Sequence, residues 1–153
     1  MTPGDLTLLR RAIVLATEAK AAGEAPFGAL LLSGGGQVLV EERNSTRADR
    51  DPTAHAELKV ARWASRSLDP DDRRRASVFA SGEPCPMCAV AHAEAGLGRL
   101  VFAFSQRQLS QVTGGPSWKL GVRELYDRRG LGVAVEGPAT ELTAESTALH
   151  SVD

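Results

Sequence analysis

The chain contains the heptapeptide Asp51-Pro52-Thr53-Ala54-His55-Ala56-Glu57. Asp is favoured at a helix N-cap and Pro at the first helical position, so Asp51 and Pro52 predict the start of a helix. This helix would carry His55 and Glu57. In a regular helix, side chains two positions apart point roughly 200° away from each other. The two residues can therefore share a site only if the first-turn geometry and the long Glu side chain bring the carboxylate back.

A second motif, Pro84-Cys85-Pro86-Met87-Cys88, also predicts a helix start. Cysteines three positions apart on one turn can both direct sulfur at a single ion. The helix N-terminus carries partial positive charge, which favours the thiolates that a metal requires. With His55 they form a nitrogen and sulfur set that suits Zn²⁺, and three protein ligands leave the fourth position for water. We therefore expect a catalytic zinc site in which Glu57 moves protons.

Three other interpretations of these residues stay open. Cys85 and Cys88 could form a redox pair, although no thioredoxin-like context surrounds them. A closed structural zinc site would need a fourth ligand, which His92 or His150 could provide. Glu57 could also be a solvated helix residue with no role in chemistry.

Hydrophobic periodicity and turn residues predict the elements around the two motifs, in the order α-β-β-α-β-α-β-α-β. A first helix contains Leu6 to Ala16 and ends at Gly23. The expected strands span residues 27–32, 37–41, 77–80, 99–104 and 131–135. Further helices are expected from residue 84 to about 96–98 and over 119–129, with shorter ones near 109–112 and after Pro138. The charged residues 69–75 suggest a solvated loop. This order favours a sheet with helices on both faces.

Composition limits the class of protein. The 153 residues suit one domain, residues 1–153, and 18 basic against 19 acidic side chains give a formal net charge of -1. A protein that depends on phosphate contacts usually has a basic excess. No apolar run is long enough for a membrane span, and residues 1–9 do not resemble a secretory signal, so we expect a cytoplasmic protein. In that compartment, a Cys-x-x-Cys pair is typical of metal or redox chemistry.

Taken together, the motifs resemble the zinc-dependent nucleobase and nucleoside deaminase superfamily, whose signature and mechanism are well defined. The similarity to bacterial guanine deaminases and tRNA adenosine deaminases extends over about residues 5–105. It includes Pro26-Phe27-Gly28-Ala29 and Asn44, seven residues before Asp51. The resemblance implies a cytidine-deaminase-like α/β fold, a three-layer α/β/α sandwich with a five-stranded mixed sheet. It also implies a homodimer in which the neighbouring subunit closes the pocket.

The resemblance also implies roles in substrate binding. Asn44 would hydrogen-bond a polar edge of the base, and the backbone of Ala56 would bind another. Glu83 would meet the substrate, and Phe27 would line or support the pocket.

Beyond Phe104 the chain departs from both groups of relatives. The tRNA enzymes often end in a basic helix, whereas residues 137–153 contain no Lys or Arg, which argues against a nucleic-acid ligand. Guanine deaminases typically carry an acidic residue in a Gly-Phe-Asp-rich loop, but here no acid precedes Glu124 in the loop after Thr113. Trp118 in this loop could stack on a base or pack the loop onto the following helix.

We therefore expect a hydrolytic deaminase that acts on a free nucleobase or related heterocycle of the guanine, cytosine or triazine type and releases ammonia. The same chemistry on tRNA adenosine is an alternative. A zinc-stabilised binding module without turnover is an alternative of another class.

Overall fold

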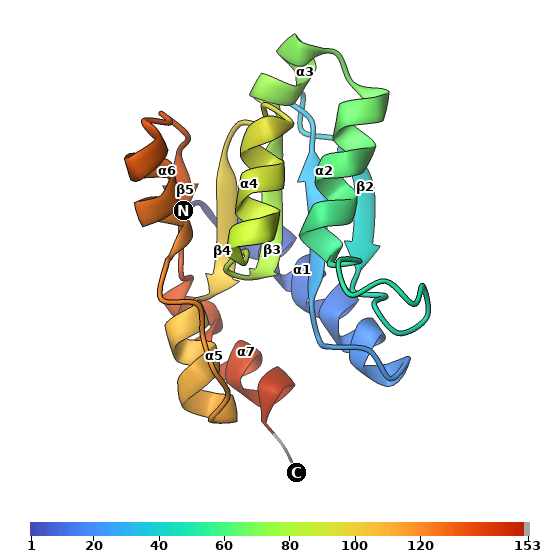
Figure 1. Ribbon diagram of the computed structural model, residues 1–153, viewed down its shortest axis with the longest axis vertical. Coiled ribbons are helices and arrows are strands. Elements are labelled where there is room, and N and C mark those ends of the chain that lie inside the picture. The colour runs from blue at the N-terminus through green and yellow to red at the C-terminus, as the bar shows by residue number, and fades with distance from the viewer. Residues whose placement is uncertain (152–153) are drawn as a thin grey trace.

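Five short strands pair into one mixed sheet in the order β2-β1-β3-β4-β5 (Figure 1). In this computed structural model, which describes residues 1–151, the strands are β1 Gly28–Leu32, β2 Val38–Arg43, β3 Ser77–Gly82, β4 Leu100–Phe104 and β5 Val135–Glu136. Strand β1 runs antiparallel to β2 and β3, whereas β3, β4 and β5 run parallel. Parallel neighbours need crossover connections, and helices provide them here.

Helices cover both faces of the sheet, as Figure 1 shows. Helices α2, α4 and α6 pack on one face, and α1 and α7 pack on the other. The helices are α1 Pro3–Ala21, α2 Ala56–Ser67, α3 Pro70–Arg75, α4 Pro86–Glu94, α5 Gln106–Thr113, α6 Val122–Arg129 and α7 Thr143–His150, with a 3₁₀ turn at Thr140–Leu142. This is the expected three-layer α/β/α sandwich, cytidine-deaminase-like in architecture.

Two apolar clusters hold the layers together, and successive strand residues alternate between them. In β1, Ala29 and Leu31 join the cluster under α2 and α4, whereas Leu30 joins the cluster under α1. This alternation follows from the two-residue period of a strand. Within residues 1–151, no helix is both long and apolar enough to cross a bilayer.

Gly28 explains how closely α1 approaches the sheet. A Cβ atom at this position would lie 2.5 Å from the carbonyl oxygen of Ala12 and 2.5 Å from Cβ of Leu15. Such distances are far below van der Waals contact, so only glycine allows β1 to pass under α1 here.

The predicted start of α2 is wrong. Asp51 does not cap the helix, because its Oδ1 accepts from the backbone N–H and hydroxyl of Thr53 and so closes a tight turn. The helix begins at Ala56, with His55 as its N-cap in an extended conformation.

Other boundaries differ for local reasons. Residues 70–75 form α3 rather than a loop, since Asp69 caps the helix at Asp72 N and Pro70 occupies its first position. Helix α5 is longer than expected because Ser105 and Gln108 form a capping box. Strand β5 covers only Val135–Glu136, so the expected strand is wrong for residues 131–134, and α6 begins at Val122, after its N-cap Gly121, rather than at residue 119.

Candidate functional site

His55 owes its position to the late start of α2. As the N-cap it has φ -74° and ψ 149°, outside the helical region, while Glu57 lies in the first turn. The 200° separation of a regular helix therefore does not apply to this pair. Both residues line the same cavity, so His55 and Glu57 can belong to one site although only two positions separate them in the chain.

The two cysteines lie at the start of α4. Cys85 is the N-cap in an extended conformation, and Cys88 is buried in the first turn. Their Sγ atoms are 3.6 Å and 3.5 Å, respectively, from Nδ1 of His55. One ligand atom from each of His55, Cys85 and Cys88 lies within 4.8 Å of the other two.

These distances fit a tetrahedral zinc ion. With Zn–S bonds of about 2.3 Å and Zn–N bonds of about 2.0 Å, tetrahedral geometry places nitrogen and sulfur ligands roughly 3.5 Å apart. The donor set is also one that zinc prefers, and His55, Cys85 and Cys88 are therefore suited to hold it. A ligand position remains open, because no fourth His, Cys, Asp or Glu of residues 1–151 joins the group.

The three residues of this cluster share hydrogen bonds that shift their pKa values in different directions. Hydrogen bonds from Cys88 and then His55 lower the pKa of Cys85 to about 4, so this thiol ionises readily. The shared hydrogen bond with Cys85, together with burial, raises the pKa of Cys88. The hydrogen bond with Cys85 also raises the pKa of His55.

His92 and His150, the two alternative fourth ligands, are engaged elsewhere. His92 is buried on α4, and its Nδ1 lies 3.0 Å from the hydroxyl of Tyr126. His150 stacks on Phe104 with ring centroids 5.8 Å apart. In the described chain, the closed four-ligand site is therefore excluded.

Glu57 is buried beside the ligands, with 8% of its surface exposed. Burial raises the pKa of this carboxyl to about 7, because the charged form loses water contacts. A carboxyl with this pKa can both accept and donate a proton near neutral pH. The interpretation of Glu57 as a solvated helix residue is thus wrong.

A cavity of about 570 Å³ opens over this group. Its volume is in the range of small-molecule sites. His55, Glu57 and Cys85 line it, together with four of the expected substrate-binding residues, Phe27, Asn44, Glu83 and Trp118. Ala56 is fully buried in the core, but as the first residue of α2 its backbone N–H has no acceptor within the helix.

Asn44 is held with a defined amide orientation. Its Oδ1 accepts from the backbone N–H of Thr46 at 3.2 Å and from the Thr46 hydroxyl at 3.1 Å. Its own backbone N–H donates to the carbonyl of Phe27 at 2.9 Å. Since Oδ1 is used, the NH₂ group is the part of the side chain that a ligand can use as a donor.

Glu83 lines the cavity, but both of its carboxylate oxygens have partners. Oε1 accepts from the backbone N–H of Val122 at 3.0 Å, and Oε2 accepts from that of Gln106 at 3.1 Å. Trp118 is 64% exposed at the cavity wall. This exposure is contrary to the interpretation in which Trp118 packs its loop onto the next helix.

Gln106, Arg47 and Arg50 are among the cavity residues that the sequence did not indicate. Gln106 is buried at the start of α5, and the capping box Ser105-x-x-Gln108 would have placed that helix start correctly. Arg47 and Arg50 are exposed and also line the cavity. Their position between Asn44 and Asp51, two motif residues, is the signal that could have identified them.

Comparison with known proteins identifies the family. Residues 3–104 match the family described as "Cytidine and deoxycytidylate deaminase zinc-binding region". The chain belongs to this family. The matched range contains all three zinc ligands and Glu57, so the deaminase family signature and the geometric cluster coincide.

Relatives in this family act on different substrates. The chain is 35% identical over 108 residues to a tRNA-specific adenosine deaminase of Haemophilus influenzae, covering 71% of this chain and 62% of the relative. It is 40% identical over 83 residues to a guanine deaminase of Bacillus subtilis, covering 54% and 53%. A solved structure from work on tRNA:A34 deaminases superposes with a TM-score of 0.71 at 30% identity, covering 92% of this chain and 99% of that one.

The chain spans only part of some relatives. It matches a tRNA(Ile)-lysidine synthase of Deinococcus deserti at 39% identity over 114 residues, which is 73% of this chain but 21% of the relative. Similarity to such a protein therefore concerns one region of it.

Proposed function

We propose that this chain is a zinc-dependent hydrolytic deaminase that converts the amino group of a free nucleobase or related heterocycle into a carbonyl group. The observation that carries this proposal is the shared cavity of Glu57, His55 and Cys85, in which the Glu57 carboxyl is buried and burial raises its pKa. The reaction consumes one water and releases one ammonia, and the ring carbon exchanges its amino group for oxygen.

His55, Cys85 and Cys88 would hold the zinc, which supplies Lewis-acid activation of water when bound. Glu57 takes a proton from the attacking water and passes it to the ring nitrogen next to the reacting carbon. It then takes the second proton of that water from the new hydroxyl group and delivers it to the departing amino group, so that the carbon–nitrogen bond breaks, the carbonyl forms and ammonia leaves. Its place in the first turn of α2 keeps the carboxyl beside His55 throughout these transfers.

The cavity walls would bind and orient the ring. The NH₂ group of Asn44 donates to an acceptor on the base, and the backbone N–H of Ala56 provides a second donor. Phe27 lines the cavity, and Trp118 offers an indole face for stacking. We assign Glu83 to shaping this wall, since its oxygens already accept backbone N–H groups. The homodimer that the resemblance implies stays a prediction, which sedimentation velocity would test.

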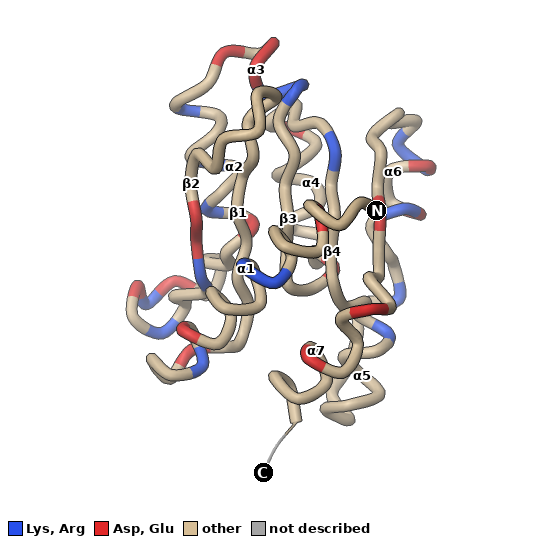
Figure 2. Tube along the Cα trace, turned by 180° about the vertical axis from the view of Figure 1, so that it is seen from behind, with Lys and Arg blue, Asp and Glu red and all other residues tan. Residues whose placement is uncertain are grey.

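A small uncharged substrate is supported by the distribution of charge. The formal net charge is -1, and residues 137–153 contain no Lys or Arg. Figure 2 shows α7 with an acidic position and no basic one. This C-terminal region therefore offers no Lys or Arg for the phosphate contacts that give nucleic-acid affinity.

Deamination of tRNA adenosine is the second candidate. One observation favours it: the exposed Arg47 and Arg50 line the cavity, where they could contact phosphates beside a flipped base. tRNA-specific adenosine deaminases are also among the relatives.

An ammonia-release screen over free bases, aminotriazines, nucleosides and tRNA tests these assignments. Release from a free base or triazine, with a rate that changes little with salt, supports the proposal. Release from tRNA alone, falling steeply as salt rises, supports the second candidate instead. Stoichiometric zinc without ammonia from any substrate would leave the binding module as the better interpretation.

A further inference from the structure

The loop that carries Trp118 is bonded to the segment just before the first zinc ligand. Glu83 accepts from the backbone N–H of Gln106, the first residue of α5, and of Val122, the first residue of α6. One carboxylate therefore caps two helices, and these helices bound the chain segment that includes residues 114–121. The segment thus ends at a residue bonded to Glu83, and it begins after a helix whose first residue is bonded to Glu83.

Gln106 adds a link at the middle of the loop. Its Nε2 donates to the carbonyl oxygen of Pro84 at 3.0 Å, and its Oε1 accepts from the backbone N–H of Trp118 at 3.2 Å. A carbonyl only accepts and a backbone N–H only donates, so the two partners fix the orientation of the amide. The side chain is 8% exposed, which strengthens both hydrogen bonds relative to bonds in water.

Little else holds Trp118 in place. The residue is 64% exposed, so packing contributes little to its position. Earlier in the loop, the hydroxyl of Ser110 donates to the carbonyl of Gly115 at 2.7 Å. Gly114, which has a left-handed conformation, and Pro116 also belong to this loop, and neither has a side chain that can hydrogen-bond to the indole. The backbone bond to Gln106 is therefore the contact that fixes the residue at the cavity wall.

We propose that Gln106 is a positioning residue, which sets substrate affinity by holding Trp118 at the wall of the cavity. This inference rests on the proposed function in one respect, namely that the indole contacts the substrate. Both polar ends of the amide bond to backbone groups, so Gln106 acts through the loop. Stacking on the ring is equally strong before and during the reaction, so the effect falls on KM rather than on kcat.

A fluorescence measurement tests the link without any substrate. Trp63 and Trp118 are the two tryptophans of the chain, so Trp63→Phe leaves Trp118 as a single reporter. In this background, Gln106→Met keeps the length of the side chain and removes both amide hydrogen bonds. We expect the time-resolved anisotropy of Trp118 to gain a larger fast component, while circular dichroism stays native.

The matched control is Gln108→Met in the same helix. Gln108 accepts from the backbone N–H and hydroxyl of Ser105, and it does not line the cavity. Its loss weakens the cap of α5 but leaves the link to Trp118 intact, so the anisotropy should match the Trp63→Phe parent. Unchanged anisotropy in a natively folded Gln106→Met variant, or an equal change in both variants, would overturn the proposal.

Kinetics on the substrate found in the ammonia screen gives the second readout. Gln106→Met should raise KM by up to roughly 30-fold with kcat nearly unchanged, the fold-change that corresponds to the loss of two hydrogen bonds of about 1 kcal/mol each. In the Trp118→Ala background the same change should have little further effect, because the indole is already absent. A fall in kcat at constant KM, or full additivity, contradicts the positioning role. Absence of turnover on every substrate contradicts the proposed function instead. The anisotropy measurement then still tests whether Gln106 holds Trp118 in place.

Discussion

The Sγ atom of Cys88 lies 3.5 Å from Nδ1 of His55, although 33 positions separate the two residues in the chain. They meet because α2 and α4 pack side by side on one face of the sheet and begin at the same end (Figure 1). His55, the N-cap of α2, and Cys88, in the first turn of α4, thus lie close enough to bind one metal ion. The site depends on the packing of two helix starts.

We expect one zinc per chain in purified protein, and Cys88→Ala should lose the metal. The variant retains only two ligands, and two ligands do not hold structural or catalytic zinc in proteins tightly. Elemental analysis after dialysis measures the stoichiometry.

His92→Gln serves as the control for this variant. His92 lies on the same helix but bonds to Tyr126, so its loss should leave about one zinc per chain. Full zinc retention in Cys88→Ala, or loss of zinc in His92→Gln, would show that the ligand set is misassigned.

Glu57→Gln should retain zinc and lose turnover by roughly 10²–10⁴-fold, the range expected for loss of a general acid-base group. The amide has nearly the shape of the carboxyl but cannot carry protons between water, ring nitrogen and leaving group. Ammonia release and zinc content are measured on the same preparation. Near-normal turnover would mean another group moves the protons, and loss of zinc would make Glu57 a ligand.

The cluster of His55, Cys85 and Cys88 could be predicted from the sequence because each motif is short and local. Pro86 favours a helix start at this point of the chain, and the three-residue spacing places both cysteines at that start. The geometry of Glu57 could not be predicted, since it depends on where α2 begins. Asp51 and Pro52 have the residue types of a helix start, but a competing turn within residues 51–53 uses the Asp carboxylate.

The contacts of the residues in the cavity wall were the hardest to predict from the sequence. Glu83 could be placed near the substrate by resemblance, but its bonds to Gln106 and Val122 join positions 23 and 39 residues away. Such contacts arise only when the chain folds α6 against α4 and α5 against α7. The exposure of Trp118 has the same origin, because a single sequence carries no signal for which loop residues find packing partners.

Trp118→Ala should raise KM and leave the melting temperature close to that of the parent. Loss of a stacking contact of about 1–3 kcal/mol corresponds to a rise of roughly 5- to 150-fold in KM. The indole is 64% exposed, so little packing is lost. Steady-state kinetics and thermal unfolding measure the two effects separately. A lower melting temperature with unaltered kinetics would assign the residue to folding.

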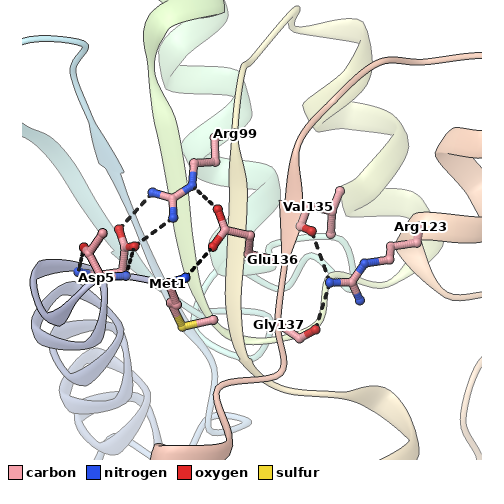
Figure 3. A network of polar contacts seen from close by, with 8 residues as sticks. Met1, Asp5, Arg99, Arg123, Val135, Glu136 and Gly137 are labelled. Carbon is pink, nitrogen blue, oxygen red and sulfur yellow. Dashed lines mark hydrogen bonds and ion pairs between the residues drawn. The ribbon is translucent and has the colours of Figure 1, made fainter.

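A buried ion pair far from the cavity ties the N-terminus to the sheet (Figure 3). Arg99 donates to both carboxylate oxygens of Asp5 at 2.8 Å and to Glu136 at 2.7 Å. The hydrogen bonds from Arg99 hold the pKa of Asp5 well below its usual range. The Asp5 side chain is 7% exposed and that of Arg99 is 28% exposed, so solvent screens this pair less than it screens a pair on the open surface.

The sign of the pH dependence follows from that lowered pKa. A carboxyl with a lower pKa in the folded than in the unfolded chain stabilises the fold above its unfolded pKa of about 3.9, and this contribution is lost as the pH falls. We expect Asp5→Asn to lower the free energy of unfolding at pH 7 by about 1.5–3 kcal/mol, since hydrogen bonds to a charged group are lost. The difference between parent and variant should shrink as the pH falls from about 5 toward 2. Protonation of the zinc ligands destabilises both proteins in this range, so the difference between the two free energies of unfolding is the quantity to measure, by urea unfolding.

Asp71→Asn is the control: its ion pair with Arg74 is exposed, and the expected change in the free energy of unfolding is below about 1 kcal/mol. A difference between parent and Asp5→Asn that stays constant down to pH 2 would show that the carboxylate charge is not what stabilises the contact.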